Sequence, residues 1–239
     1  MHRIDLPDWA IERGRRMNRF DRIDPRRTAL LAVDLQNAFT RPGAVFANDH
    51  ACDILPNVNR LAKALRNAGG HIVWTRQTIT SEPPWAHPRW QFDATDPFVR
   101  KAMDALADGA DGHRLHDALD IHPGDVVLNK YRYSAFIQGA SDIDTALIRR
   151  NVDTLIVAGT LTNVCCESSA RDAYMLGYRI LFAADATAAV TDAEHNAALL
   201  NLCLNFADVR TTEHLVGLIE RAAQARRSVT DPQPPTVRG

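Results

Sequence analysis

Short apolar runs alternate along the chain with longer segments in which apolar residues recur at helical spacing. The apolar runs predict strands at Ala29–Val33, His71–Thr75, Val126–Leu128, Thr154–Ala158, Arg179–Ala183 and Asp208–Thr211. The amphipathic segments predict helices at Pro56–Asn67, Asp142–Arg150, Cys166–Leu176, Asp192–Asn205 and Thr212–Ala225. This alternation favours an α/β fold, a three-layer sandwich in which a parallel six-stranded sheet carries helices on both faces.

The strand and helix pattern occupies residues 28–227, which we interpret as one domain. Residues 1–27 are rich in arginine and predict an N-terminal arm with a short helix from Pro7 to about Met17. We expect this arm to pack on a subunit or other neighbour, in preference to binding a polyanion. The proline-containing residues 228–239 predict a flexible tail. The stretch Thr78–Asp96 is rich in proline and tryptophan and predicts a long loop or lid.

Composition narrows the possible partners and the location of the protein. The net charge is −1 and the sequence pI is about 6.7. The chain therefore lacks the strong positive charge that would attract nucleic acid or an anionic membrane. The chain opens without the apolar core of a signal peptide, and no apolar run is long enough to span a bilayer. Its cysteines show no CxxC spacing and are expected to be reduced: Cys52, Cys165, Cys166 and Cys203. We therefore expect a soluble cytoplasmic protein.

Residues whose side chains can take part in catalysis lie at the ends of several predicted strands. Asp34 closes the first strand, Lys130 follows the third, and Cys165 lies in the turn after the fourth. In an open parallel sheet, ligands bind outside the carboxyl ends of the strands. Alone, the aspartate would be a turn cap and the lysine a solvated side chain. Together they supply a base, a cation and a nucleophile, and the positive end of the following helix favours a thiolate over a thiol.

The segments around these residues resemble the signatures of the isochorismatase-like cysteine hydrolases. They are Val33–Phe39, Lys130–Phe136 and Gly159–Cys165, and the resemblance runs from about Thr28 to Val216. It implies a Rossmann-like sheet topology, no cofactor, and a homodimer or homotetramer. It also implies that Asp34, Lys130 and Cys165 form a catalytic triad.

The same resemblance assigns roles within the nucleophile turn. It implies a non-proline cis peptide bond at Thr160–Leu161 and an oxyanion hole formed by the backbone N–H groups of Leu161 and Cys165. The nucleophile of the family aligns with Cys165, three residues after Thr162, so we interpret Cys166 as a small buried hydrophobic residue. A catalytic Cys165 should be alkylated faster than Cys166 and well below the ordinary pKa of a thiol.

These groups suggest a covalent mechanism for amide hydrolysis. Asp34 would accept the proton of Cys165, while Lys130 holds the charges of the cluster together. The sulfur would attack an amide-type carbonyl, and Asp34 would return the proton to the leaving nitrogen. Water would then hydrolyse the thioester or thiocarbamate on Cys165.

The substrate class follows from differences among the known members of the family. Nicotinamidases carry an Asp-x-His metal pair soon after the second strand, and Trp74–Thr78 lacks it, so no metal is expected. We interpret His195 as a helix-surface or capping residue. Isochorismatases cleave an enol ether without a nucleophile, whereas the retained Cys165 favours amide chemistry. Several segments look closest to ureidoacrylate amidohydrolases and other members that cleave ureides or amides. We therefore expect a small-molecule amide or ureide substrate, as in biuret and triuret hydrolysis.

Candidate substrate-binding residues depend on the charge of that substrate. An acid would need an arginine for bidentate pairing, and the candidates are Arg76, Arg89 and Arg132. A neutral ureide would need amide groups, and the candidates are Gln36, Asn37, Gln77 and Asn163. Aromatic side chains would wall the pocket: Phe39, Trp85, Trp90 and Phe136. The alternatives are an N-carbamoyl amino acid amidase, a maleamate amidase, an isochorismatase, or a non-catalytic binding protein of the same fold.

Overall fold

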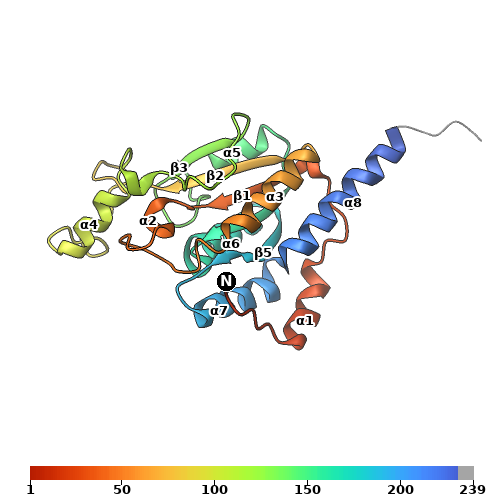
Figure 1. Cartoon of the computed structure of the whole chain (residues 1–239), viewed down its shortest axis with the longest axis horizontal. Helices are drawn as coiled ribbons and strands as arrows, with labels where there is room; N and C mark the ends of the chain where they lie inside the picture. The colour runs from red at the N-terminus through yellow and green to blue at the C-terminus, as the bar shows by residue number, and fades with distance from the viewer. Residues whose placement is uncertain (231–239) are drawn as a thin grey trace, which may run out of the picture.

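A computed structural model describes residues 1–230 of the chain as a single parallel sheet covered by helices (Figure 1). The strands are β1 (Thr28–Val33), β2 (His71–Gln77), β3 (Val126–Lys130), β4 (Thr154–Thr160), β5 (Arg179–Ala188) and β6 (Asp208–Arg210). All pairings are parallel, in the spatial order β3-β2-β1-β4-β5-β6. The predicted six-stranded α/β fold is confirmed.

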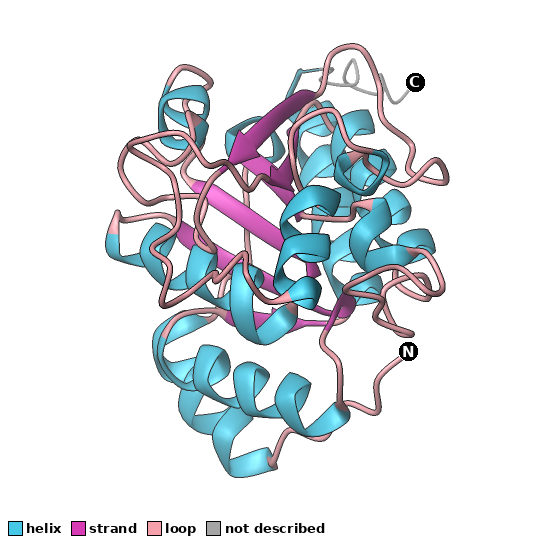
Figure 2. Ribbon diagram, turned by 90° about the vertical axis from the view of Figure 1, so that its left-hand side faces the viewer, coloured by secondary structure: helices cyan, strands magenta, loops and turns pink. Residues whose placement is uncertain are grey.

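Helices surround the sheet on both faces, as Figure 2 shows. The α-helices are α1 (Asp8–Asn18), α2 (Asn37–Thr40), α3 (Leu55–Asn67), α4 (Pro97–Ala105), α5 (Ile143–Ile148), α6 (Glu167–Met175), α7 (Asp192–Asn205) and α8 (Thr212–Thr230). Shorter helical turns are η1 (Pro25–Arg27), η2 (Asp111–His113) and the π-helix η3 (Thr162–Cys166). In the described part of the chain, no helix combines the length and apolarity needed to cross a membrane.

Successive side chains of β1 point to opposite faces of the sheet, so the apolar core has one part on each face. Leu30 packs in one cluster with residues of α3 and α8, including Leu61. Leu31 packs in the other with residues of α5, α6 and α7, including Leu147 and Leu199. Because both faces are buried, the strand is apolar at every position, and this is why it reads as a continuous run in the sequence.

Several elements extend beyond their predicted ends or were not predicted. β2 continues to Gln77 and β5 to Ala188, because backbone pairing persists where the side chains become polar or small. The helix α4 was missed, although its start carries a recognisable signal. Asp96 accepts hydrogen bonds from two N–H groups of the first turn, and Pro97 occupies its first position. The stretch Thr78–Asp96 contains no helix or strand, as predicted.

The N-terminal arm packs on its own domain, with α1 against α7. Ala10 is fully buried, and a Cβ added to Gly14 would lie 2.1 Å from the carbonyl oxygen of Cys203, so the helices approach closely. The backbone N–H of Asp5 also donates to Asn196 Oδ1 at 2.7 Å. At the other end, α8 runs to Thr230, so the start of the predicted tail is helical; residues 231–239 lie outside the described residues.

Gly159 lies inside β4 and allows that strand to approach β1. The predicted strand ends at Ala158, whereas Gly159 still pairs with Val33 in the sheet. Its φ is +119°, and a Cβ at this position would lie 2.1 Å from the carbonyl oxygen of Val33. Only glycine fits both the conformation and the space. The close approach sets the distance between the residues that follow β1 and β4.

We predict that Gly159→Ala lowers the free energy of unfolding by about 3 kcal/mol or more, because it adds a clash to a left-handed backbone. Urea denaturation would measure it. Gly109→Ala is the matched control, since Gly109 has a φ of +83° with no atom near its Cβ position. If the two variants lost the same free energy of unfolding, the role assigned to the contact with Val33 would be contradicted.

Candidate active site

The strand order brings the predicted triad to one edge of the sheet. The order reverses between β1 and β4, which is the switch point where open parallel sheets bind ligands. Asp34 follows β1, Cys165 lies in the turn after β4, and Lys130 is the last residue of β3. Asp34 has a φ of 51°, a left-handed conformation that aspartate tolerates better than most residues. The chain therefore turns sharply where β1 ends.

A buried ion pair joins the first two of these residues. Lys130 Nζ lies 2.7 Å from Asp34 Oδ2, and both side chains are 0% exposed. Thr75 Oγ1 donates to Asp34 Oδ1 at 2.8 Å, and Lys130 Nζ donates to Gln77 Oε1 at 2.6 Å. Lys130 Nζ also donates to the carbonyl oxygen of Arg132 at 3.0 Å. A buried ion pair is tolerated when further hydrogen bonds satisfy it in this way.

The charges of this cluster set the protonation of the lysine. Burial by itself would lower the pKa of Lys130, but the nearby Asp34 and Cys165 outweigh it and raise that pKa. Lys130 therefore stays a cation inside the protein. Asp34 Oδ2 is held by the ion pair and makes no well-aligned hydrogen bond, so it can accept a proton from a thiol.

Burial disfavours the thiolate form of Cys165. Its side chain is almost fully buried, and burial raises its pKa to about 12, with Lys130 opposing the rise and Asp34 adding to it. Desolvation therefore opposes the stabilisation of a thiolate that the helix dipole was expected to provide. Cys166 is 0% exposed and packs in the apolar cluster under α6, as expected for a small hydrophobic residue.

The nucleophile turn is a single π-helical turn. The carbonyl oxygen of Leu161 accepts hydrogen bonds from the N–H groups of Val164 at 3.2 Å and Cys166 at 3.1 Å. The peptide bond Thr160–Leu161 is cis, as the family resemblance implied. Leu161 and Cys165 thus sit at the two ends of one tight turn, and their role as oxyanion donors stays a prediction.

His195 supports this turn from α7. It is fully buried, and its Nδ1 lies 2.9 Å from Thr162 Oγ1. Burial lowers the pKa of His195 to about 4, so the ring is neutral. The interpretation of His195 as a surface or capping residue is wrong: Thr191 caps the helix, and His195 faces inward from its first turn.

The amide side chains predicted to bind substrate are divided in their roles. Gln36 is engaged on both amide atoms, since its Nε2 donates to Gln77 O and His113 O and its Oε1 accepts from Gln77 N–H. Gln36 thus joins the end of β2 at Gln77 to the turn at His113, and its amide atoms are not free to bind a substrate. Asn37 Nδ2 donates to the carbonyl oxygen of Asp111. Within residues 1–230, the buried Oδ1 of Asn163 has no hydrogen-bond partner.

Aromatic residues hold part of the predicted lid in place. The ring of Trp85 stacks on Tyr131 with centroids 6.4 Å apart. The Arg132 guanidinium lies 5.0 Å from the Trp85 ring centroid and donates to Trp85 O at 2.9 Å. Phe136 packs in the same apolar cluster as Cys165. The loop is thereby attached to the segment that follows Lys130.

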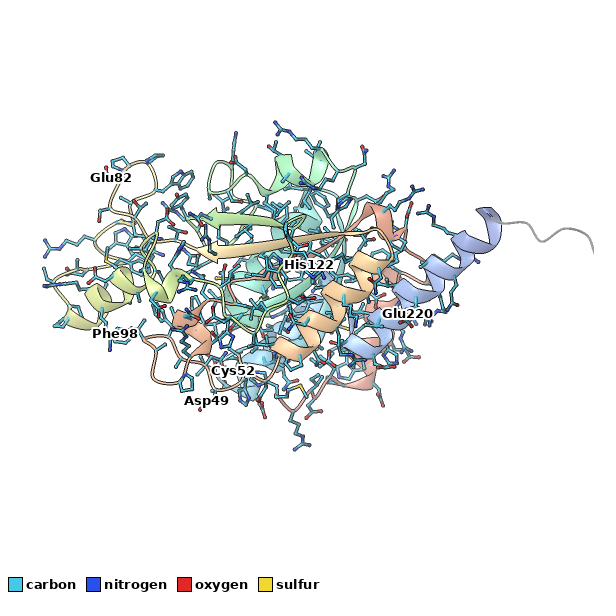
Figure 3. All side chains as sticks on the ribbon, turned by 45° about the horizontal axis from the view of Figure 1, so that its top comes forward. Asp49, Cys52, Glu82, Phe98, His122 and Glu220 are labelled. Atoms are coloured by element: carbon cyan, nitrogen blue, oxygen red, sulfur yellow. The ribbon has the colours of Figure 1, made fainter. Side chains whose placement is uncertain are left out.

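Two other predicted wall residues lie elsewhere. Phe39 stacks on Phe46 in a separate small cluster, with centroids 5.5 Å apart. Trp90 is 85% exposed, so it walls no pocket in this structure. Figure 3 shows the labelled Glu82, in the loop, and Phe98, in α4, at the end of the molecule opposite Glu220 of α8.

The candidate arginines differ in their surroundings. Arg132 is committed to Trp85, and the exposed Arg89 lies beside Asp93 at 3.4 Å. Arg76 lies between Thr75 and Gln77 on β2, so strand alternation directs it to the opposite face from the ion pair. Its charge acts on the nearby His113 and contributes to lowering the pKa of that ring, after burial.

Thr75 is the site residue that sequence reasoning missed. Its hydroxyl holds Asp34 from the middle of the sheet. The alternation of β2 offered a signal, because a strand that presents Gln77 at this edge presents Thr75 on the same face.

We predict that alkylation of Cys165 accelerates about tenfold per pH unit from roughly pH 7 to pH 9, because the thiolate fraction rises by that factor below the pKa. Iodoacetamide labelling followed by peptide mass spectrometry would measure it. As the control, the same thiol in urea should level off near its ordinary pKa of about 8.5. A rate in the folded chain that does not change over this range would indicate a preformed thiolate and contradict the assignment.

Comparisons with known proteins show what this chain is similar to. The family model described as "Isochorismatase domain" matches residues 28–214. The chain is 34% identical over 218 residues to a ureidoacrylate amidohydrolase RutB of Methylobacterium radiotolerans, covering 84% of this chain and 83% of that protein. It is 31% identical to the RutB of Caulobacter segnis, covering 84% and 89%. A cysteine hydrolase structure from Pseudomonas syringae pv. phaseolicola superposes with a TM-score of 0.77 at 29% identity, covering 86% and 97%. The chain therefore belongs to the isochorismatase family.

Proposed function

We propose that this chain is a cysteine-dependent amidohydrolase that cleaves a C–N bond of a small ureide or carbamoyl amide. The observation that carries the proposal is the convergence of Asp34, Lys130 and Cys165 in one buried cluster. The RutB relatives, which are named as ureidoacrylate amidohydrolases, support a ureide in preference to other amides.

In the first half of the reaction, the proton of Cys165 moves to Asp34 Oδ2 as Sγ attacks the substrate carbonyl carbon. The transfer accompanies the attack because the pKa of the resting thiol is about 12. Lys130 remains charged and stabilises the carboxylate before the transfer. The N–H groups of Leu161 and Cys165 stabilise the negative oxygen that forms, a contribution of about 3–4 kcal/mol for each donor.

In the second half, Asp34 gives its proton to the leaving nitrogen, and the C–N bond breaks. A ureide attacked at its ureido carbonyl leaves a carbamoyl group on Cys165 as a thiocarbamate. Asp34 then takes a proton from water, which attacks the same carbonyl carbon. Carbamate is released, the thiol is restored, and carbamate decomposes to ammonia and carbon dioxide.

Binding of the substrate requires the closed site around Cys165 to open. The ion pair is fully buried and Cys165 is 5% exposed, so solvent and substrate reach the thiol only when its cover opens. Asn163 Oδ1 is a buried acceptor without a partner in the described residues, and it suits a ureide N–H. Phe136 supplies apolar surface beside the thiol.

A panel of ureidoacrylate, biuret, triuret, N-carbamoyl amino acids, maleamate and nicotinamide, assayed for ammonia, tests this proposal. We expect the ureides to be hydrolysed with the highest kcat/KM. Cys165→Ala and Asp34→Ala should each lower kcat by roughly 1,000-fold or more without unfolding the chain.

Cys166→Ala is the matched control, because it removes the adjacent thiol and leaves the proposed machinery intact. It should retain most of the turnover. Near-wild-type kcat in Cys165→Ala, or turnover of none of these compounds by the folded protein, would argue for a binding protein of the same fold instead.

A further inference from the structure

A second polar cluster lies outside the proposed triad, where three distant segments meet. It comprises His2 of the N-terminal arm, His50 of the loop between α2 and α3, and Asp192 at the start of α7. One possible ligand atom from each residue lies within 4.8 Å of the other two. Imidazole nitrogens and carboxylate oxygens are the ligands of zinc sites other than those built from cysteine.

His2 is held in a fixed orientation within this cluster. Its side chain is 2% exposed, and its ring stacks on His195 with centroids 4.3 Å apart at 14°. Its Nε2 lies 3.1 Å from the carbonyl oxygen of Ala189. The same Nε2 lies 3.0 Å from the backbone nitrogen of Ala189, so it can either donate to the carbonyl or accept from the N–H. With a metal ion on Nδ1, the ring would take the tautomer that donates through Nε2 to the carbonyl, the arrangement that orients a metal-binding histidine.

The other two side chains can adjust around His2. Its Nδ1 lies 2.7 Å from Asp192 Oδ1, and its ring centroid lies 4.0 Å from that of His50. The side chains of His50 and Asp192 are 30% and 52% exposed, so small rotations meet little resistance. Tetrahedral zinc, with bonds of about 2.0–2.2 Å, needs ligand atoms about 3.3 Å apart. The possible ligand atoms lie within 4.8 Å of one another, and Nδ1 of His2 is 2.7 Å from Asp192 Oδ1, so small side-chain rotations bring them to this spacing.

We propose that His2, His50 and Asp192 bind one Zn²⁺ ion, with water in the fourth position. The set has two nitrogen ligands and one carboxylate, which suits zinc and disfavours the hard ions Mg²⁺ and Ca²⁺. The partly exposed side chains of His50 and Asp192 leave the open position facing solvent.

The ion ties the arm to the start of α7 and to the loop that carries His50. His195, which stacks on His2, is also the residue whose Nδ1 lies 2.9 Å from Thr162 Oγ1. The proposed zinc site therefore supports the nucleophile turn indirectly, through the ring of His195. It takes no part in the chemistry of Asp34, Lys130 and Cys165. The proposal stands independently of the proposed hydrolase activity.

Isothermal titration calorimetry with ZnCl₂ tests the site in the untagged chain. The background carries Cys165→Ala, which removes a buried thiol able to bind zinc itself. We expect one ion per chain. His50→Ala should weaken Zn²⁺ binding by roughly 100-fold, and Asp192→Asn by at least about 10-fold. Substituting Co²⁺ should give a visible spectrum of nitrogen and oxygen ligands, without a thiolate charge-transfer band.

His122→Ala is the matched control, and His122 is labelled in Figure 3. Its Nε2 lies 3.0 Å from the carboxylate of Asp120, and both side chains are exposed. It should bind Zn²⁺ like the parent, and Mg²⁺ should not compete. The proposal is overturned if no Zn²⁺ binding is detected, if His50→Ala and Asp192→Asn bind as the parent does, or if His122→Ala loses as much affinity.

Discussion

The buried ion pair between Asp34 and Lys130 is the interaction on which the rest of the site depends. Charges taken out of water are costly, and this pair lies where both side chains are fully covered. Two side chains of the intervening strand β2 offset that cost. Thr75 donates a hydrogen bond to Asp34, and Gln77 accepts one from Lys130. Lys130 therefore reaches Asp34 across a strand that holds both partners.

The close approach of β1 and β4 at Gly159 places the thiol beside this pair. Burial raises the pKa of Cys165 and so favours the protonated thiol. A protonated thiol beside a carboxylate and a cation suits a mechanism in which proton transfer and attack occur together. Burial also shields the thiol from solvent, since the ion pair is fully covered and Cys165 is 5% exposed.

The sequence allowed prediction of the sheet and of the meeting of Asp34, Lys130 and Cys165 at one edge, because both leave local signals. Buried parallel strands are apolar throughout, and the triad residues fall where those strands end. The extension of β2 to Gln77 was missed because backbone pairing outlasts the apolar run. The raised pKa of Cys165 could not be predicted, since it depends on burial and on Lys130 and Asp34, which are distant in the sequence. The structural role of Gln36 could not be predicted for the same reason, since its side chain bonds the backbone of His113.

The covalent role of Cys165 is the central claim, and trapping the intermediate tests it most directly. Protein quenched in acid while it hydrolyses ureidoacrylate would be digested and examined by tandem mass spectrometry, with a parallel reaction in hydroxylamine. The account predicts a carbamoyl group on Cys165, and its capture by hydroxylamine as hydroxyurea. A carbamoyl group on Cys166, or steady turnover from which hydroxylamine captures no carbamoyl group, would contradict it.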